Sequence, residues 1–150
     1  MVYGVIVAIL FAGDFFLKKQ VEEKIEKDQQ HEVCGGKIVI QKYYNNGAAL
    51  NFMEKRPKVL RSFCGGIVLI VGIIWYLFLR EKRNPGVLLG LSLMLGGGAS
   101  NLYDRIIKGH VVDYFSFRTP WNWFNKIVFN ISNMFIFAGS ILVVLFGKGK

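Results

Sequence analysis

The chain has 150 residues, of which 53% are hydrophobic and 15% aromatic, and its formal net charge is +9 at pH 7. A length of this order fits one domain, but a soluble domain of this size could not bury the four long apolar blocks that the sequence contains. No zinc-ligand spacing and no nucleic-acid-binding module is visible, so the positive charge favours contact with anionic lipid headgroups over DNA or RNA.

The four apolar blocks predict four membrane-spanning helices, at about residues 2–18, 63–80, 86–103 and 126–147. A helix needs about 20 apolar residues to cross a bilayer, with a range of about 17–25. We therefore expect one membrane-embedded domain over residues 1–150. Its fold class would be all-α membrane, with four transmembrane helices and a small extracytoplasmic β-sheet and loop region.

The first block shares its hydrophobicity with secretory signal peptides, but not their other features. It lacks a basic N-terminal region, contains Asp14, and continues into charged residues instead of a small-residue cleavage site. We interpret it as a retained span. Residues 18–32 are strongly charged and contain no Gly or Pro, so they are expected to continue the first helix out of the membrane.

Two short segments outside the spans have the pattern of β-strands. "GGKIVIQKYY" (residues 35–44) reads as a turn and a strand, and "HVVDYFSF" (residues 110–117) as a second strand. The two are expected to pair into a small sheet on the membrane surface. Trp121 and Trp123 follow, where an aromatic belt would lie.

Four spans place both termini on one side of the membrane. The short cationic turn "REKRN" at residues 80–84 favours the cytoplasm for that side. The two larger segments on the other side nevertheless hold most of the Lys and Arg residues, so charge alone decides the orientation only weakly.

Polar and ionisable residues gather at one predicted depth. Such groups are costly in a membrane unless paired, and they mark functional sites. The end of the first span, the end of the third and the start of the fourth all meet one leaflet, so these residues are expected to converge on a shared site. The alternative is a set of ordinary interhelical hydrogen bonds, each contributing about 0.6 kcal/mol. The residues are Asp14, Lys18, Asn101, Asp104, Arg105, Asp113, Asn130 and Asn133.

Three motifs, in order, resemble those of the lipoprotein signal peptidases (signal peptidase II). "NNGAALNF" resembles their N-x-G-A-A motif, "GGGASNLYDRIIKGHVVDYFSF" their G-G-A-x-G-N-x-x-D-R…G-x-V-V-D-F motif, and "FNISNMF" their F-N-x-A-D motif. The resemblance covers essentially the whole chain. It implies an aspartyl peptidase of the bacterial cytoplasmic (inner) membrane that removes the signal peptide from diacylglyceryl-modified prolipoproteins, just before the modified cysteine. It also implies cytoplasmic termini and an active site near the outer leaflet.

The resemblance also assigns residues. Asp113 matches one catalytic aspartate, and Asn133 occupies the position of the second. Arg105 is interpreted either as a holder of substrate backbone or loop geometry, or as a partner that balances Asp104 or Asp14. No metal or cofactor is implied. The residues expected to bind substrate or support the site are Asp14, Lys18, Asn45, Gly47, Asn101, Asp104, Arg105 and Asn130.

Asn133 is the largest departure from the family pattern. An aspartic peptidase keeps one carboxylate ionised to activate water and a second one protonated to support the oxyanion. An asparagine amide can donate a hydrogen bond, but it has no carboxyl proton to exchange. Loss of one acid–base partner costs about 10²–10⁴-fold in rate, so we expect cleavage to be lost or strongly impaired while the fold and substrate binding survive.

Two origins of Asn133 stay open: an engineered substitution, or a natural paralogue that has lost its activity. The alternative function is a non-catalytic membrane protein that binds lipidated signal peptides. Phe15, Gly98 and Ser100 also replace usual family residues, and we expect these changes to affect packing more than chemistry. A disulfide between Cys34 and Cys64 is undecided. The expected partners are the prolipoprotein substrate and membrane lipids, with a peptide inhibitor as a further occupant. A monomer is expected.

Overall fold

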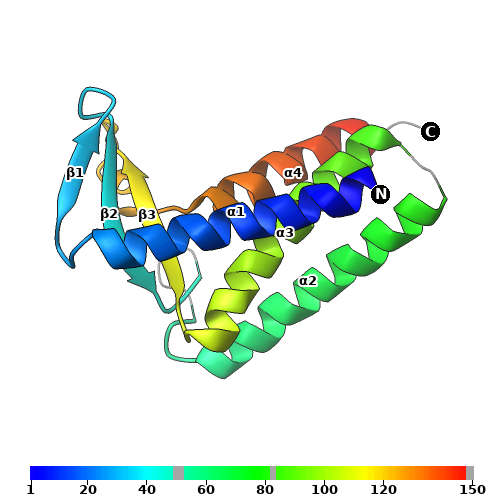
Figure 1. Ribbon diagram of the computed structural model, residues 1–150, viewed down its shortest axis with the longest axis horizontal. Helices are drawn as coiled ribbons and strands as arrows, with labels where there is room; N and C mark the ends of the chain where they lie inside the picture. Colours follow the sequence, from blue (N-terminus) through cyan, green and yellow to red (C-terminus); the bar gives the residue numbers. More distant parts are fainter. Residues whose placement is uncertain (49–52, 82–83, 148–150) are drawn as a thin grey trace.

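The computed structural model of the chain describes residues 1–48, 53–81 and 84–147. Its main elements are four helices: α1 (Val2–Lys24), α2 (Pro57–Arg80), α3 (Pro85–Ile107) and α4 (Ile131–Gly147). The helices form an elongated bundle with a small β-sheet at one end, and the N-terminus and the end of α4 lie at the other (Figure 1).

Two helices, α2 and α3, are long and apolar enough to cross a membrane by length and composition, and α4 is a shorter apolar helix of 17 residues. Large apolar side chains project from the bundle surface, as Phe63 and Ile70 do from α2. These features agree with a membrane protein. The arrangement of four spans stays a prediction, because α1 carries charged residues from Asp14 to its end and α4 is short.

Local sequence sets where α2 and α3 begin. Proline occupies the first helical position of both, where its missing N–H costs no helical hydrogen bond. Asn84 caps α3, because its side-chain oxygen accepts the Gly86 N–H at 2.9 Å. The Asn84 amide also donates to the Phe146 carbonyl at 3.1 Å, which ties the start of α3 to the end of α4.

Helix α3 contacts the other three helices (Figure 1). Its contact with α4 is backbone to backbone, since a Cβ at Gly97 would lie 2.6 Å from the Ser132 carbonyl oxygen and one at Gly90 would lie 2.7 Å from the Gly139 carbonyl oxygen. Small residues of this kind let membrane helices approach closely. Its contact with α2 is made by side chains, and the Trp75 indole N–H donates to the Ser92 hydroxyl at 2.8 Å.

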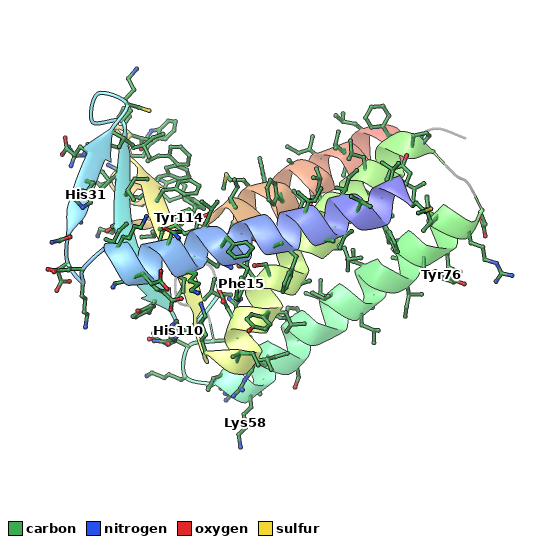
Figure 2. All side chains as sticks on the ribbon, in the orientation of Figure 1. Phe15, His31, Lys58, Tyr76, His110 and Tyr114 are labelled. Atoms are coloured by element: carbon green, nitrogen blue, oxygen red, sulfur yellow. The ribbon has the colours of Figure 1, made fainter. Side chains whose placement is uncertain are left out.

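The sheet has three antiparallel strands in the order β1 (Gln30–Val33), β2 (Ile38–Asn45) and β3 (Val111–Phe117). Side chains alternate between the two faces of a strand. On β3, Val112 and Tyr114 are buried with Val21 of α1, and Figure 2 shows Tyr114 at this junction of sheet and helix. Asp113 therefore points to the other face of the sheet.

The two strands predicted from sequence are confirmed as β2 and β3, but the fold is mostly helical with three strands, not two. The prediction that residues 18–32 continue the first helix is wrong beyond Lys24. The chain leaves the helix there, and a left-handed turn at Asp28 (φ 72°) leads into β1, whose fully exposed residues pair with β2 at the sheet edge.

The predicted start of the last helix at residue 126 is also wrong. Residues Phe124–Lys126 form a short 3₁₀ helix, and Phe129 makes an isolated bridge to Phe115 of β3. Helix α4 begins at Ile131, because the Asn130 side-chain oxygen accepts the Asn133 N–H at 2.9 Å and caps the helix. Asn130 and Asn133 are thus not two residues of one helix, and they have different structural roles.

Candidate active site

Asp113 is a buried carboxylate held by two asparagine amides. Its Oδ2 accepts a hydrogen bond from Asn45 at 2.9 Å and its Oδ1 accepts one from Asn130 at 2.7 Å. Burial raises the pKa of Asp113 from 3.8 to about 6, against the opposing effects of these hydrogen bonds and of the Lys18 and Arg105 charges. Near neutral pH this carboxylate can therefore take up and release a proton.

The orientations of the Asn45 and Asn130 amides are fixed by backbone N–H groups, which can only donate a hydrogen bond. The Gly47 N–H donates to Asn45 Oδ1 at 3.0 Å, and the Asn133 N–H donates to Asn130 Oδ1. Both side chains must then turn their NH₂ groups outward, toward Asp113. Asp113 consequently meets donors on both oxygens, which favours its ionised form.

Asn101 links this carboxylate to the second position of interest. Its Oδ1 accepts from the Lys18 ammonium at 2.8 Å and from Asn130 at 3.0 Å, so its NH₂ group faces the opposite way. That NH₂ donates to Asn133 Oδ1 at 2.9 Å. Asp113 and Asn133 are therefore joined through Asn130 and Asn101. We call Asp113, Asn133 and the amides of Asn45, Asn130 and Asn101 the cavity site.

A second polar group, the ion cluster, consists of Asp14, Lys18 and Asp104. The Lys18 Nζ lies 2.6 Å from Asp14 Oδ2 and 2.9 Å from Asp104 Oδ2, and all three residues are 1% exposed. Lys108 balances the excess negative charge at the Asp104 end of the cluster. Its Nζ lies 3.3 Å from Asp104 Oδ1 and 2.6 Å from Glu22 Oε2. The cluster thus runs from the interior to the surface with alternating charge.

Hydroxyl groups complete the coordination of Asp14. Ser100 and Ser132 each donate to its Oδ2 at 2.6 Å, and Tyr114 donates to its Oδ1 at 3.3 Å. The sequence analysis assigned Ser100 a packing effect and did not select Ser132 or Tyr114. Ser100 and Ser132 could have been noticed as hydroxyl residues within apolar helical runs. Their polar partner, Asp14, lies on another helix.

Arg105 anchors the turn that follows Asn45 at the end of β2. Its guanidinium donates to the Gly47 carbonyl at 2.8 Å and, at 3.4 Å, to the Asn101 carbonyl. Of the two interpretations given for Arg105, the structure shows the loop contact, because Asp14 and Asp104 are paired with Lys18. Arg105 Nε is buried and meets no acceptor within the described part of the chain.

A cavity of about 860 Å³ opens on the cavity site. Asp113, Asn133, Asn45, Asn101 and Arg105 border it at its polar end. The remaining wall is mostly apolar, and such a pocket with a few convergent polar groups is typical of a binding site. The apolar wall includes Ile67 and Val68 from α2, together with Met134, Ile136 and Phe137 from α4, and the free cysteine Cys64 also borders it.

The structure brings together all the residues that the sequence analysis selected. Five of them come from α1 and α3, Asn45 comes from the end of β2, Gly47 from the turn after it, and the others from β3 and the start of α4. Within the described residues, no group of three His, Cys, Asp or Glu side chains could hold a metal ion. The selected residues divide between the ion cluster and the cavity site, with Arg105 and Gly47 bracing the loop beside them.

The chain is similar to known proteins along most of its length. A family model described as Signal peptidase (SPase) II matches residues 6–147. A lipoprotein signal peptidase of Ectopseudomonas mendocina is 32% identical over 139 residues, which are 91% of this chain and 82% of the relative. One from Streptococcus pneumoniae is 25% identical over 144 residues, 96% of this chain and 90% of the relative.

Two solved structures described as a bacterial membrane enzyme have the same fold. Their TM-scores are 0.81 and 0.77, at 23% and 21% sequence identity. Each covers 96% of this chain, and the matched parts are 85% and 90% of the two solved chains. At this identity the likeness concerns the fold alone.

Proposed function

The chain belongs to the signal peptidase II family of proteases, and we propose that it recognises diacylglyceryl-modified prolipoproteins at the junction just before the modified cysteine. The reaction of the site is aspartic peptide hydrolysis, which removes the signal peptide. Asp113 is the carboxylate that activates water. Asn133 stands where the second carboxylate is required, so cleavage by this chain is slowed by about 10²–10⁴-fold.

The observation that carries this proposal is the pairing of Asp113 and Asn133 on one cavity. Asp113 is buried, its pKa is raised to about 6, and both residues border the same space. A carboxylate in this state can accept a proton from water attacking a peptide carbonyl. The Asn133 amide can hydrogen-bond to that carbonyl, but it cannot deliver a proton to the leaving nitrogen.

The shape of the cavity supports the class of substrate. A lipidated signal peptide has an apolar helix and acyl chains next to the peptide bond to be cut. The cavity has apolar walls from α2 and α4 and places its polar groups at one end, so the lipid and the peptide bond would meet matching surfaces. Such a site spares the acyl chains contact with water.

The same proposal includes the setting of the protein. The chain is a single domain and a monomer of the bacterial inner membrane with four spans, both termini in the cytoplasm and the active site near the outer leaflet. The apolar helices α2 and α3 support a membrane location. The position of the sheet at the end of the bundle opposite the N-terminus supports an active site on the side of the membrane away from the N-terminus (Figure 1).

A second candidate function is favoured by Asn133 itself. A chain that keeps the whole site and lacks one carboxylate can serve as a membrane protein that binds lipidated signal peptides without cutting them. The two candidates differ in what the substitution Asn133→Asp does. If the rest of the site is competent, the added carboxylate restores cleavage.

The test is cleavage of a diacylglyceryl-modified prolipoprotein in detergent by the chain as given and by Asn133→Asp. We expect activity in the variant at least about 100-fold above that of the native chain. Asn122→Asp is the matched control, because it adds the same charge at an exposed position that does not border the cavity. An inactive Asn133→Asp variant that still binds the prolipoprotein would reject the peptidase and leave the binding function.

A further inference from the structure

The hydrogen bonds around Asn133 determine which end of its amide faces the cavity. Lys18 has only donors, so Asn101 must turn its oxygen toward the ammonium at 2.8 Å. The Asn101 NH₂ group then donates to Asn133 at 2.9 Å, which requires the Asn133 oxygen on that side. The chain of bonds that starts at Lys18 thus leaves the Asn133 NH₂ group on the other side.

That NH₂ group is available to a ligand. Asn133 borders the cavity together with Asp113. Its backbone N–H donates to the Asn130 side-chain oxygen, and its own side-chain oxygen accepts from Asn101. Its Nδ2 has no hydrogen-bond acceptor within residues 1–48, 53–81 and 84–147. The polar end of the cavity therefore presents a fixed donor at Asn133 and an acceptor at Asp113, and both side chains border the same space.

An aspartate at position 133 would behave differently. One of its oxygens would accept the Asn101 bond in the same way, and the other would face the cavity. That outer oxygen is a donor only when it carries a proton, whereas an amide NH₂ is a donor in every protonation state of the site. Asn133 thus reproduces the hydrogen bonding of a neutral carboxyl group and cannot become an anion.

Resting on the proposed function, we propose that Asn133 is a substrate-binding residue in its own right. Its NH₂ donates to the carbonyl oxygen of the intact peptide bond at the lipidated junction, so the chain retains uncleaved precursor and does not retain the cleaved signal peptide. The preferred ligand is an uncharged peptide group flanked by a lipidated residue. Asn133 is thereby a determinant of which form of the peptide is bound.

The charge of the Asp113 carboxylate favours the intact bond. A peptide group offers an acceptor for Asn133 and a donor for Asp113, and it carries no charge. A cleaved signal peptide ends in a carboxylate, which would meet the Asp113 carboxylate, and two like charges at close range oppose each other. Two cations also border the cavity. The Arg105 guanidinium donates to the Gly47 and Asn101 carbonyls and has no acceptor at Nε within the described residues, and Lys126 is exposed to solvent.

The test is equilibrium binding at pH 7.5 of two synthetic probes to the purified chain in detergent. One is a fluorescent signal peptide that spans the junction and carries diacylglyceryl-cysteine, and the other is the same signal peptide ending in a free carboxylate at the junction. We expect the native chain to bind the spanning probe at least ten-fold more tightly. Asn133→Leu, which keeps the size and removes the donor, should weaken the spanning probe by about three- to ten-fold. Asn122→Leu, at an exposed position, should leave it unchanged.

A change in the probe locates the hydrogen bond. Replacing the junction carbonyl oxygen by sulfur gives a thioamide, which is a weaker acceptor. The replacement should weaken binding to the native chain and have no comparable effect on Asn133→Leu, as expected of two groups that contact each other. Should Asn133→Leu fail to fold, Asn133→Ala takes its place in the cycle.

Three results overturn the inference while leaving the proposed function intact. These are unchanged binding of the spanning probe by the donor-free variant, an equal effect of the thioamide on both chains, or tighter binding of the carboxylate probe. A failure of the native chain, Asn133→Asp and Asn133→Leu all to bind the spanning probe would overturn the proposed function together with the inference.

Discussion

The ion cluster and the cavity site are joined by the hydrogen bond from Lys18 to Asn101, but their carboxylates are neutralised to different extents. In the ion cluster each carboxylate of Asp14 and Asp104 meets the Lys18 ammonium within 3 Å, and nothing is left for a ligand. In the cavity site one carboxylate, Asp113, is held by neutral amides and borders an open cavity. Compensated charge holds the helices together, while charge left without a counterion is available to a ligand.

Removing the carboxylate of the cavity site should give the largest effect on function. In the Asn133→Asp background, Asp113→Asn removes the group that activates water, so we expect the cleavage rate to fall by about 10²–10⁴-fold. The measurement is the initial rate of prolipoprotein cleavage, with thermal unfolding as the check on folding. Retained cleavage would show that the unpaired charge of Asp113 is not the one that serves the reaction.

Breaking the ion cluster should instead unfold the protein. Lys18→Met leaves Asp14 and Asp104 buried without their cation, and loss of one partner from a buried ion pair costs about 3–5 kcal/mol. The measurement is unfolding in detergent. Lys19→Met is the control, because Lys19 and Glu23 form an exposed pair at 3.8 Å that contributes at most about 1 kcal/mol. Equal losses from both variants would contradict the structural role given to the ion cluster.

The pH dependence of the free energy of unfolding tests whether the Asp113 carboxylate is buried without a counterion. Its pKa in the folded chain is about 6, above the ordinary 3.8, so the folded state holds this proton more firmly than the unfolded state. The resulting stabilisation is complete below pH 3.8 and is lost as the pH rises through 6. Relative to Asp113→Asn, the free energy of unfolding of the native chain should fall by about 2 kcal/mol between pH 4 and pH 7. A flat difference would mean that Asp113 is as well solvated as a surface residue.

The smallest effect is expected at the outer end of the ion cluster. Glu22→Gln removes the partner of Lys108, and side-chain exposures of 26% and 22% place this pair in partial contact with water. We expect a loss of at most about 1 kcal/mol in the free energy of unfolding. A loss as large as that of Lys18→Met would show that the buried part of the cluster depends on its surface partner.

The sequence predicted which residues meet, because the order of spans and the depth of their polar residues bring the ends of the first and third helices to the start of the fourth. It also predicted β2 and β3, which are rich in β-branched and aromatic residues. Strand β1 was not predicted, because all four of its residues are exposed and an edge strand without a buried face has no alternating pattern.

Other features of the site could not be predicted from the pattern alone. Asn130 looked like part of an apolar helix, although an asparagine directly before a helix is a preferred cap. The directions of the Asn101 and Asn133 amides depend on Lys18, which is more than 80 residues away along the chain from Asn101. Only the folded structure shows which donors face one another.

The glycines between α3 and α4 have a further consequence for what the protein can accept. Backbone contact at Gly90 and Gly97 leaves no room for the two helices to approach, so Asn101 and Asn133 are carried on one rigid unit. The α2 wall of the cavity, with Ile67 and Val68, is attached through side chains that can repack. We therefore expect longer or branched acyl chains to be accommodated by a displacement of α2. Helix α2 would then adapt to different lipids, while α3 and α4 hold the groups that bind the peptide bond in fixed positions.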